Sequence, residues 1–248
     1  MLRKLLKTLT GGIERPAPPV GRIYAVGDIH GRNDLLARLL SVIEHDAKSE
    51  PAEFIFLGDY IDRGEDSRGV IERLIELAAQ SPHRTTYLKG NHEATLLDFL
   101  SDPGVGPVWA RFGGLETLAS YGVTPPRTNE PEAWISVQNQ FLDALPNAHR
   151  EFFEGLHLSA ERGCYLFVHA GVDPARRIDQ QSEEDVLWIR EVFLNDDRAL
   201  ERIIVHGHTP EERPVNDGRR IGLDTGAYIT NRLTAARLEG ARVAFLST

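Results

Sequence analysis

The sequence contains a single cysteine, Cys164, and this scarcity excludes several classes of site. One cysteine cannot form an intramolecular disulfide or a zinc-finger framework, and low cysteine content fits a reducing compartment. A cysteine-dependent phosphatase would need an arginine six positions later, where the chain has Ala170. Cys164 is therefore predicted to be a small core residue in a strand.

The chain also lacks long hydrophobic runs and an excess of basic residues. No apolar stretch approaches the roughly 20 residues of a membrane helix, so no transmembrane segment is expected. The net charge is −9, which argues against nucleic acid binding because the phosphate backbone would repel the protein. A phosphorylated substrate remains compatible with this charge, since two bound cations would reverse its sign locally.

What is present is an ordinary globular composition, with 41% hydrophobic and 26% charged residues in a chain of 248. Residues 1–20 are predicted to form a flexible lead segment that ends in a proline cluster. Residues 21–248 are predicted to form one domain. We expect a cytoplasmic monomer.

Three polar loops are the most informative feature of the chain. Their sequences are G-D-I-H-G at Gly27–Gly31, G-D-Y-I-D-R-G at Gly58–Gly64 and G-N-H-E at Gly90–Glu93. Each follows an apolar run that is predicted to be a strand: Arg22–Val26, Glu53–Leu57 and Arg84–Leu88. Loops that follow successive strands can converge at one edge of a sheet. Side chains of these types, spaced for two metal ions, are typical of a hydrolytic centre for phosphate esters.

The first metal ligands are predicted from these loops. Asp28 and His30 are two residues apart, and in an extended strand end their side chains would point toward the same ion. Asp59 is placed to bridge two ions through its two oxygens. Asn91 offers a neutral carbonyl ligand.

Neighbouring loop residues are predicted to act on the substrate. His92 faces away from its neighbour Asn91, as a proton donor should. Asp62 and Arg63 lie at a turn, where the guanidinium of Arg63 matches a phosphoryl group; a surface ion pair is the simpler alternative. Glu93 is predicted to be a helix N-terminal charge without a further role.

Two downstream loops carry histidines at the ends of predicted strands. His169 follows Cys164–Val168, and the segment H-G-H-T-P follows Ile203–Val205. His208 is the better candidate ligand of that pair, because Gly207 frees its backbone. His206 is either a hydrogen-bond donor to a metal-ligating side chain or a structural side chain.

Arg190, in the sequence L-W-I-R, is a candidate for a second phosphate clamp. A buried Trp188 beside it would fix the arginine over the site. The alternative is an ordinary surface arginine.

The order of elements predicts an α/β fold of two stacked mixed β-sheets flanked by helices. Helical stripes of leucine and isoleucine follow the first two loops. Residues from about 96 to 158 are rich in aromatic side chains and are predicted to be a helical insertion over the active-site edge. Strands resume at Arg219–Leu223, and Leu233–Leu238 and Arg242–Leu246 form a predicted hairpin.

These loops, with G-G-L-E-T-L-A-S-Y-G at Gly113–Gly122 and D-T-G-A at Asp224–Ala227, resemble the phosphoprotein phosphatase family of calcineurin-like metallophosphoesterases, in its lambda-type bacterial and phage branch. The resemblance implies a dinuclear metallophosphatase, specifically a serine/threonine protein phosphatase. It implies a first metal site of Asp28, His30 and Asp59, and a second of Asp59, Asn91, His169 and His208. It makes His92 the general acid supported by Asp62, and it makes Arg63 and Arg190 phosphate ligands.

The expected reaction is hydrolysis of a phosphomonoester of a phosphorylated protein or peptide by a hydroxide held between two divalent ions. The mixed nitrogen and oxygen ligands suit Mn²⁺, with iron or zinc as alternatives. The segment G-H-T-P lacks the second histidine of the wider superfamily's G-H-x-H motif, and H-A-G replaces the H-G-G of eukaryotic relatives.

Three other functions remain open at this point. Symmetrical diadenosine tetraphosphate hydrolases share nearly all of these loops. The Asp224-Thr225-Gly226 triplet suggests an aspartic protease, but such a site needs two carboxylates and the chain has one such triplet. A non-catalytic phosphopeptide-binding module would need a decayed site, whereas every expected ligand is present.

Overall fold

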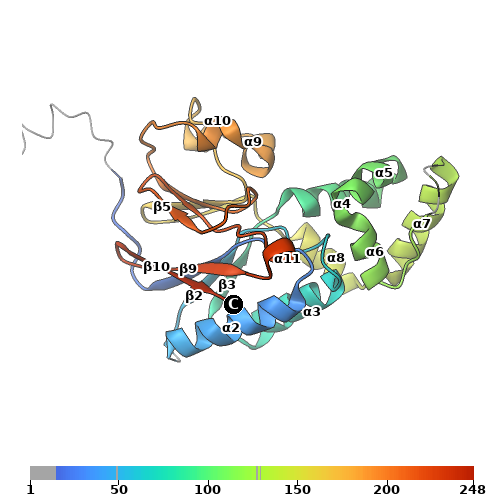
Figure 1. The fold of residues 1–248 in the computed structure, drawn as a ribbon, viewed down its shortest axis with the longest axis horizontal. Helices are drawn as coiled ribbons and strands as arrows, with labels where there is room; N and C mark the ends of the chain where they lie inside the picture. The colour runs from blue at the N-terminus through green and yellow to red at the C-terminus, as the bar shows by residue number, and fades with distance from the viewer. Residues whose placement is uncertain (1–14, 49, 127, 129) are drawn as a thin grey trace, which may run out of the picture.

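Two five-stranded mixed sheets form the centre of the protein. The computed structural model describes residues 15–48, 50–126, 128 and 130–248, so most of the predicted lead segment lies outside the described residues. The first sheet has the order β10-β9-β1-β2-β3 and the second the order β4-β5-β6-β8-β7 (Figure 1). The strands are β1 Arg22–Val26, β2 Glu53–Phe56, β3 Arg84–Tyr87, β4 Ser159–Arg162, β5 Tyr165–Val168, β6 Ile203–His206, β7 Val215–Asn216, β8 Arg220–Gly222, β9 Thr234–Glu239 and β10 Arg242–Ser247.

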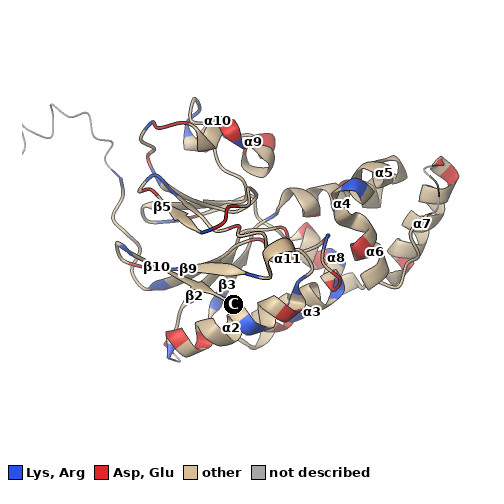
Figure 2. Ribbon diagram, viewed as in Figure 1, with Lys and Arg blue, Asp and Glu red and all other residues tan. Residues whose placement is uncertain are grey.

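Helices cover the outer faces of both sheets and build the insertion (Figure 1). Their bounds are α2 Asn33–Ala47, α3 Ser67–Gln80, α4 Asn91–Ser101, α5 Gly106–Trp109, α6 Leu115–Ser120, α7 Pro131–Ala144, α8 Asn147–Glu154, α9 Glu183–Trp188, α10 Glu191–Leu194 and α11 Ala227–Thr230. None of the helices within the described residues has the length and hydropathy needed to cross a membrane. Acidic and basic residues both occur along α2 and α3 (Figure 2).

The main cores lie between the sheets and under the helices. The inner faces of the two sheets meet through side chains including Ile23, Ile55, Leu57, Phe167, Val205, Ile221 and Leu238. The predicted stripe of α2 is confirmed, since Leu35, Leu36, Leu39 and Ile43 are buried. Burial of each such side chain contributes about 1.5–3 kcal/mol to folding, so these contacts stabilise the packing of α2 on the first sheet.

The fold class is confirmed, with local differences. The C-terminal hairpin is present, and β9 also pairs with β1. The short edge strands β4 and β7 were not predicted, because their polar sequences S-A-E-R and V-N carry no apolar pattern. The helices of the insertion run from Asn91 to Glu154, since α4 starts directly from the third loop.

The parallel strands place the loops. Strands β1, β2 and β3 are mutually parallel, and so are β5, β6 and β8. Their carboxyl ends meet at one edge of the sandwich, where ligand-binding loops of α/β sheets commonly lie. Arg15, near the end of the predicted lead segment, donates hydrogen bonds to the carbonyl oxygens of Leu200 and Gly218 beside the second sheet.

Candidate active site

The loops at this edge have unusual backbone conformations. His30, Asp59, Asp62, Arg63 and His208 all have positive φ, between 47° and 71°. Such conformations cost free energy in residues with a side chain and concentrate at functional sites. The expected extended geometry of the first loop is therefore wrong at His30, because a residue with a φ of 47° does not continue the strand alternation.

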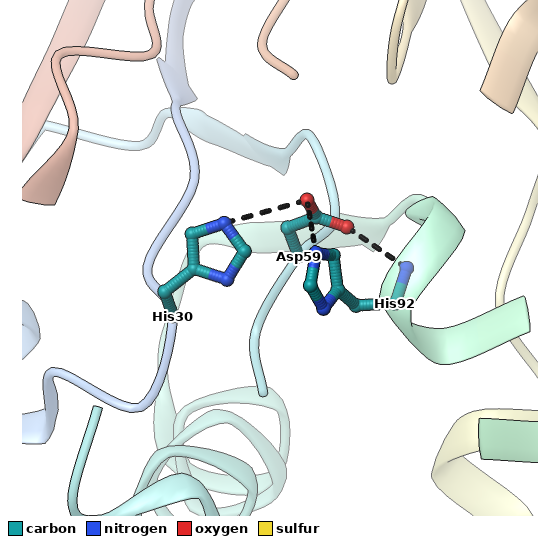
Figure 3. Close-up of side chains that lie close together, drawn as sticks. All are labelled: His30, Asp59 and His92. Carbon is teal, nitrogen blue, oxygen red and sulfur yellow. Dashed lines mark hydrogen bonds and ion pairs between the residues drawn. The ribbon is translucent and has the colours of Figure 1, made fainter. Parts of the chain in front are cut away.

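Asp59 lies at the centre of two groups of metal-compatible side chains. Its Oδ2 is 3.5 Å from Nε2 of His30 and 3.8 Å from Nε2 of His92 (Figure 3). Its Oδ1 is 3.4 Å from Nε2 of His169, which belongs to a second group with His208. One carboxylate thus faces histidines on both sides, the arrangement expected of a bridging ligand.

The second group brings several lone pairs together. Nδ1 of His169 is 2.9 Å from the carbonyl oxygen of Leu57 and donates to it, so the neutral ring has its lone pair on Nε2. That Nε2 lies 2.9 Å from Oδ1 of Asn91 and 3.2 Å from Nδ1 of His208. His30 is held similarly, with its Nδ1 3.0 Å from the carbonyl oxygen of Ile61. These acceptors converge in a way that suits a cation.

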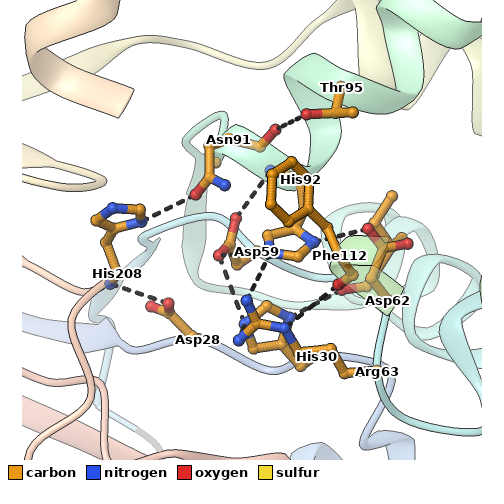
Figure 4. Close-up of polar contacts among 12 residues, drawn as sticks. Asp28, His30, Asp59, Asp62, Arg63, Asn91, His92, Thr95, Phe112 and His208 are labelled. Atoms are coloured by element: carbon orange, nitrogen blue, oxygen red, sulfur yellow. Dashed lines mark hydrogen bonds and ion pairs between the residues drawn. The ribbon is translucent and has the colours of Figure 1, made fainter. Parts of the chain in front are cut away.

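Asp28 and His208 each have a buried polar atom that a bound cation or water could satisfy. Oδ2 of Asp28 accepts from the backbone N–H of His208 at 2.9 Å (Figure 4). Oδ1 of Asp28 and Nε2 of His208 are buried and have no hydrogen-bond partner within the described part of the chain. A buried carboxylate oxygen without a partner is costly unless a cation or water satisfies it. A Cβ at Gly207 would clash with Asp28 Oδ1, so glycine is required for this approach.

Burial and neighbouring charges shift the pKa values of several side chains in the site. Burial, followed by the charges of Asp224 and Asp59, holds the pKa of Asp28 well above its usual range. Burial opposes ionisation of Asp59 too, but the surrounding histidines, His169 foremost, outweigh it and lower its pKa. Burial lowers the pKa of His208 to about 2, which keeps the ring neutral as a ligand must be.

Asp62 and His92 form a short hydrogen-bonded pair (Figure 4). Nδ1 of His92 lies 2.6 Å from Oδ2 of Asp62, and neither side chain is appreciably exposed. Burial lowers the pKa of His92, but the carboxylates of Asp59 and Asp62 outweigh burial and raise it. Oδ1 of Asp62 also accepts from Thr117 at 2.6 Å, and Trp109 Nε1 donates to the same carboxylate.

Arg63 lies beside both histidines of the first group. Its guanidinium nitrogens are 3.2 Å from Nε2 of His30 and 3.1 Å from Nε2 of His92. The guanidinium also stacks over the ring of Tyr228, 4.7 Å from its centroid. A partly exposed arginine at this position can reach an anion that enters the site.

Arg190 and His206 belong to neither of the two groups around Asp59. Arg190 is exposed, and its charge contributes to lowering the pKa of His169 and His208. The expected burial of Trp188 is wrong: this ring is only half-buried, and it contacts the rings of Phe112 and His208. His206 Nδ1 donates to the carbonyl oxygen of Gly207, so of its two predicted roles the geometry favours the structural one.

Glu93 has a larger role than the predicted helix-terminal charge. Its fully buried carboxylate accepts from the backbone N–H groups of Asp59, Tyr60, Ile61 and Gly90, at 2.8–3.3 Å. Burial and the charge of Asp59 raise its pKa to about 8, although the hydrogen bonds from Tyr60 and Gly90 lower it. Glu93 thus ties the second loop to the third. The spacing Gly-x-x-Glu of a capping box was the available signal.

The sequence connects Asp224 only with the family segment D-T-G-A and with a protease triplet, but in the structure it lies close to Asp28. Burial raises its pKa to about 6. Its Oδ1 accepts from the backbone N–H of Gly226 at 2.8 Å. The acidic group beside Asp28 could not be paired with it from the sequence, because about 200 residues separate them.

Residues 21–240 match the calcineurin-like phosphoesterase family. The chain belongs to this family. Two curated relatives are each 27% identical to it. One is the asymmetrical bis(5'-nucleosyl)-tetraphosphatase PrpE of Oceanobacillus iheyensis, aligned over 87% of this chain and 88% of the relative. The other is serine/threonine-protein phosphatase 1 of Salmonella typhimurium, aligned over 88% of this chain and 92% of the relative.

Solved structures share the fold. A protein provisionally described as a diadenosine tetraphosphatase superposes with a TM-score of 0.63 at 22% identity, covering 93% of this chain and 98% of that one. A cold-active protein tyrosine phosphatase gives a TM-score of 0.60 at 16% identity, covering 94% and 79%. The chain is therefore a metallophosphoesterase, a hydrolase of a family that uses divalent metal ions.

Proposed function

We propose that the protein is a serine/threonine protein phosphatase with two divalent ions at the edge of the sandwich. The observation that carries this proposal is the position of Asp59, whose two oxygens face different histidine groups at 3.5 and 3.4 Å. The proposed ligands of the first ion are Asp28, His30 and Asp59. Those of the second are Asp59, Asn91, His169 and His208.

The ions would polarise the phosphoryl oxygens and lower the pKa of a bound water. The donor set of imidazole, carboxylate and amide groups supports Mn²⁺, with iron or zinc as alternatives. The chain's own groups contribute orientation and charge. In the proposed role, Arg63 and Arg190 bind the phosphoryl group and offset the charge that develops on it.

His92 is the proposed general acid. Its Nε2 now accepts from Arg63, and an incoming phosphoryl group would take over those N–H groups. Nε2 is then free to carry a proton and to give it to the oxygen of the departing serine or threonine. Asp62 holds Nδ1 and stabilises the protonated ring.

A pocket of about 480 Å³ beyond Arg63 supports a peptide substrate over a dinucleotide. Its rim carries the carboxylates of Asp34, Glu65 and Asp66. Arg32 also lines it, but both Nε and NH2 of Arg32 bind Asp34, at 2.9 and 2.8 Å. Arg63 lines the pocket too, and Asp34 is paired with Arg32, so within the described part of the chain Glu65 and Asp66 are the lining carboxylates without an ion pair. A polyphosphate tail would meet these two charges, whereas a peptide with basic side chains would be attracted to them.

Hydrolysis of dinucleoside tetraphosphates is the second candidate. The name of the Oceanobacillus relative supports it, and that relative aligns over nearly the same share of this chain as the Salmonella phosphatase. The specificity in that name is asymmetrical, whereas the sequence resemblance indicated symmetrical enzymes.

One substrate panel tests both candidates. A Mn²⁺-loaded preparation is assayed on a phosphoserine peptide, a phosphotyrosine peptide and diadenosine tetraphosphate. We expect the highest kcat/KM on the phosphoserine peptide, and higher still when basic residues flank the phosphoserine. A large preference for the dinucleotide would overturn the first choice of substrate, and no turnover on any of them would overturn both.

Replacement of the acid gives a sharper test of mechanism. We expect His92→Asn to lower kcat on the phosphoserine peptide by about 100-fold, within the usual range for a general acid. Metal content is measured on the same sample by plasma emission spectroscopy. A loss of less than about tenfold with the metal intact would contradict the assignment of His92.

A further inference from the structure

We infer that the helical insertion positions the general acid, through two side chains, Trp109 and Thr117, that complete the coordination of Asp62. The inference rests on the proposed function, because it concerns the pair of Asp62 and His92. Both residues are positioning residues, since they contact the carboxylate that holds His92 and not the substrate.

Asp62 is wholly enclosed and depends on the insertion for most of its hydrogen bonds. Its Oδ1 accepts from Thr117 Oγ1 at 2.6 Å, and Trp109 Nε1 lies 3.2 and 3.0 Å from its two oxygens. The remaining short contact of Oδ2 is to His92 Nδ1 at 2.6 Å. The side chain is 0% exposed, so water does not compete for these oxygens.

Thr117 also fixes the backbone of Asp62. Its Oγ1 accepts from the Asp62 N–H at 2.9 Å while donating to Oδ1 of the same residue. Ser67 Oγ, at the start of α3, accepts from the same N–H at 3.0 Å and lies 2.9 Å from Thr117 Oγ1. The Thr117 hydroxyl therefore binds both the backbone N–H and the carboxylate of Asp62, a residue whose φ is 71°.

The insertion approaches this loop closely through an irregular turn. Ala110–Gly114 forms a single π-helical turn, in which Gly113 has a φ of 103°. The carbonyl oxygen of Gly113 accepts from the N–H of Arg63 at 3.1 Å. The turn places Trp109 and Thr117 on either side, so both reach Asp62. A π-turn at a functional site is a recurrent feature of helices.

The chemical consequence concerns the leaving group. A fully hydrogen-bonded Asp62 orients the imidazole of His92 through its Nδ1. A serine alkoxide needs the proton of His92 as the P–O bond breaks, whereas p-nitrophenolate leaves without one. Loss of a hydrogen bond to Asp62 should therefore lower turnover of the phosphoserine substrate more than turnover of the aryl phosphate.

The test compares Thr117→Val, which keeps the shape and removes the hydroxyl, with Thr117→Ser, which retains it. We expect Thr117→Val to lower kcat on a phosphoserine peptide by about 10- to 100-fold, the equivalent of one buried hydrogen bond to a charged group. The loss on p-nitrophenyl phosphate should be several-fold smaller, with KM little changed. Thr117→Ser should restore most of the activity. Ser136→Ala, which removes a hydroxyl at an exposed position of α7 in the same insertion, is the matched control.

Two further measurements separate positioning from general damage. In the protein loaded with diamagnetic Zn²⁺, NMR should show a downfield, protected Nδ1–H signal of His92 in the wild type and in Thr117→Ser, and its loss in Thr117→Val. In a double-mutant cycle with Asp62→Asn, the effect of Thr117→Val on phosphoserine turnover should largely disappear. Trp109→Phe removes the second donor and should show the same dependence on the leaving group.

Equal losses on both substrates, or an unchanged His92 signal, would overturn this inference while leaving the proposed function intact. Full activity of Thr117→Val on the phosphoserine peptide would do the same. A wild-type enzyme that hydrolyses neither substrate with Mn²⁺ would instead overturn the proposed function, and the inference with it.

Discussion

At the scale of single residues, Asp59 is the residue that belongs to both groups of metal-compatible side chains. Its conformation is held by Glu93, which accepts from the backbone N–H groups of Asp59 and Tyr60. Its position at the end of β2 was predictable, since a polar residue after an apolar run is a candidate ligand. The role of Glu93 was not, because a buried carboxylate bound to another loop looks like a helix-capping residue in the sequence.

The proposed bridging role of Asp59 leads to a prediction for metal binding. We expect Asp59→Asn to bind fewer than two Mn²⁺ per chain and to weaken the remaining affinity by about tenfold or more, because a shared negative ligand is lost. Equilibrium dialysis measures both quantities. Asp98→Asn, an identical change at an exposed position of α4, is the control. Unchanged stoichiometry in Asp59→Asn would contradict the bridging role.

At the scale of elements, the insertion and the sheet edge are joined by backbone contact as well as by side chains. Gly113 lies so close to the second loop that a Cβ there would be 2.6 Å from the backbone N of Arg63. Its φ of 103° is also unfavourable for any other residue. The helical character of this segment followed from its sequence, but its closeness to Asp62 and Arg63 did not.

We therefore predict that Gly113→Ala lowers the free energy of unfolding by about 1–3 kcal/mol and lowers activity as well, because the second loop must shift. Gly122→Ala is the matched control, since Gly122 has a φ of 79° but open space where a Cβ would lie. It should show a stability loss and retain activity. Urea denaturation and turnover on p-nitrophenyl phosphate measure the two effects. Equal activity losses in both variants would contradict the steric explanation.

At the scale of the whole molecule, the candidate site draws on both sheets. Asp28, Asp59 and Asn91 follow strands of the first sheet, whereas His169 and His208 follow strands of the second. Metal binding should therefore stabilise the complete sandwich. With Mn²⁺ at about 100 times its Kd, one ion adds about 2.7 kcal/mol, or about 5–10 °C in Tm for a chain of this size.

Calorimetry before and after treatment with EDTA measures this shift. We expect EDTA, which removes both ions, to lower the Tm by at least this amount and to abolish turnover, and added Mn²⁺ to restore both. An aspartic protease would be insensitive to the chelator. A Tm that does not respond to Mn²⁺ would mean that the ions do not join the two sheets.

The sequence predicted the strands that precede the loops and the side chains that those loops present, because apolar runs and polar ends are local patterns. It did not predict contacts between distant segments. The approach of Asp224 to Asp28 and the contact of Thr117 with Asp62 depend on how the sheets and helices pack. The positive φ of His30 and Asp59 could not be predicted from the sequence either, since neither residue is glycine.

The division of donors between two sheets has a consequence for the order of assembly. A nascent chain that has made only strands β1 to β3 holds Asp59 and Asn91 but lacks both histidines of the second group. An ion at that position would therefore bind only after His208 has been synthesised and β6 has paired with β5. Binding of this ion would then report that the two sheets have come together, and no product truncated before His208 could bind the full pair.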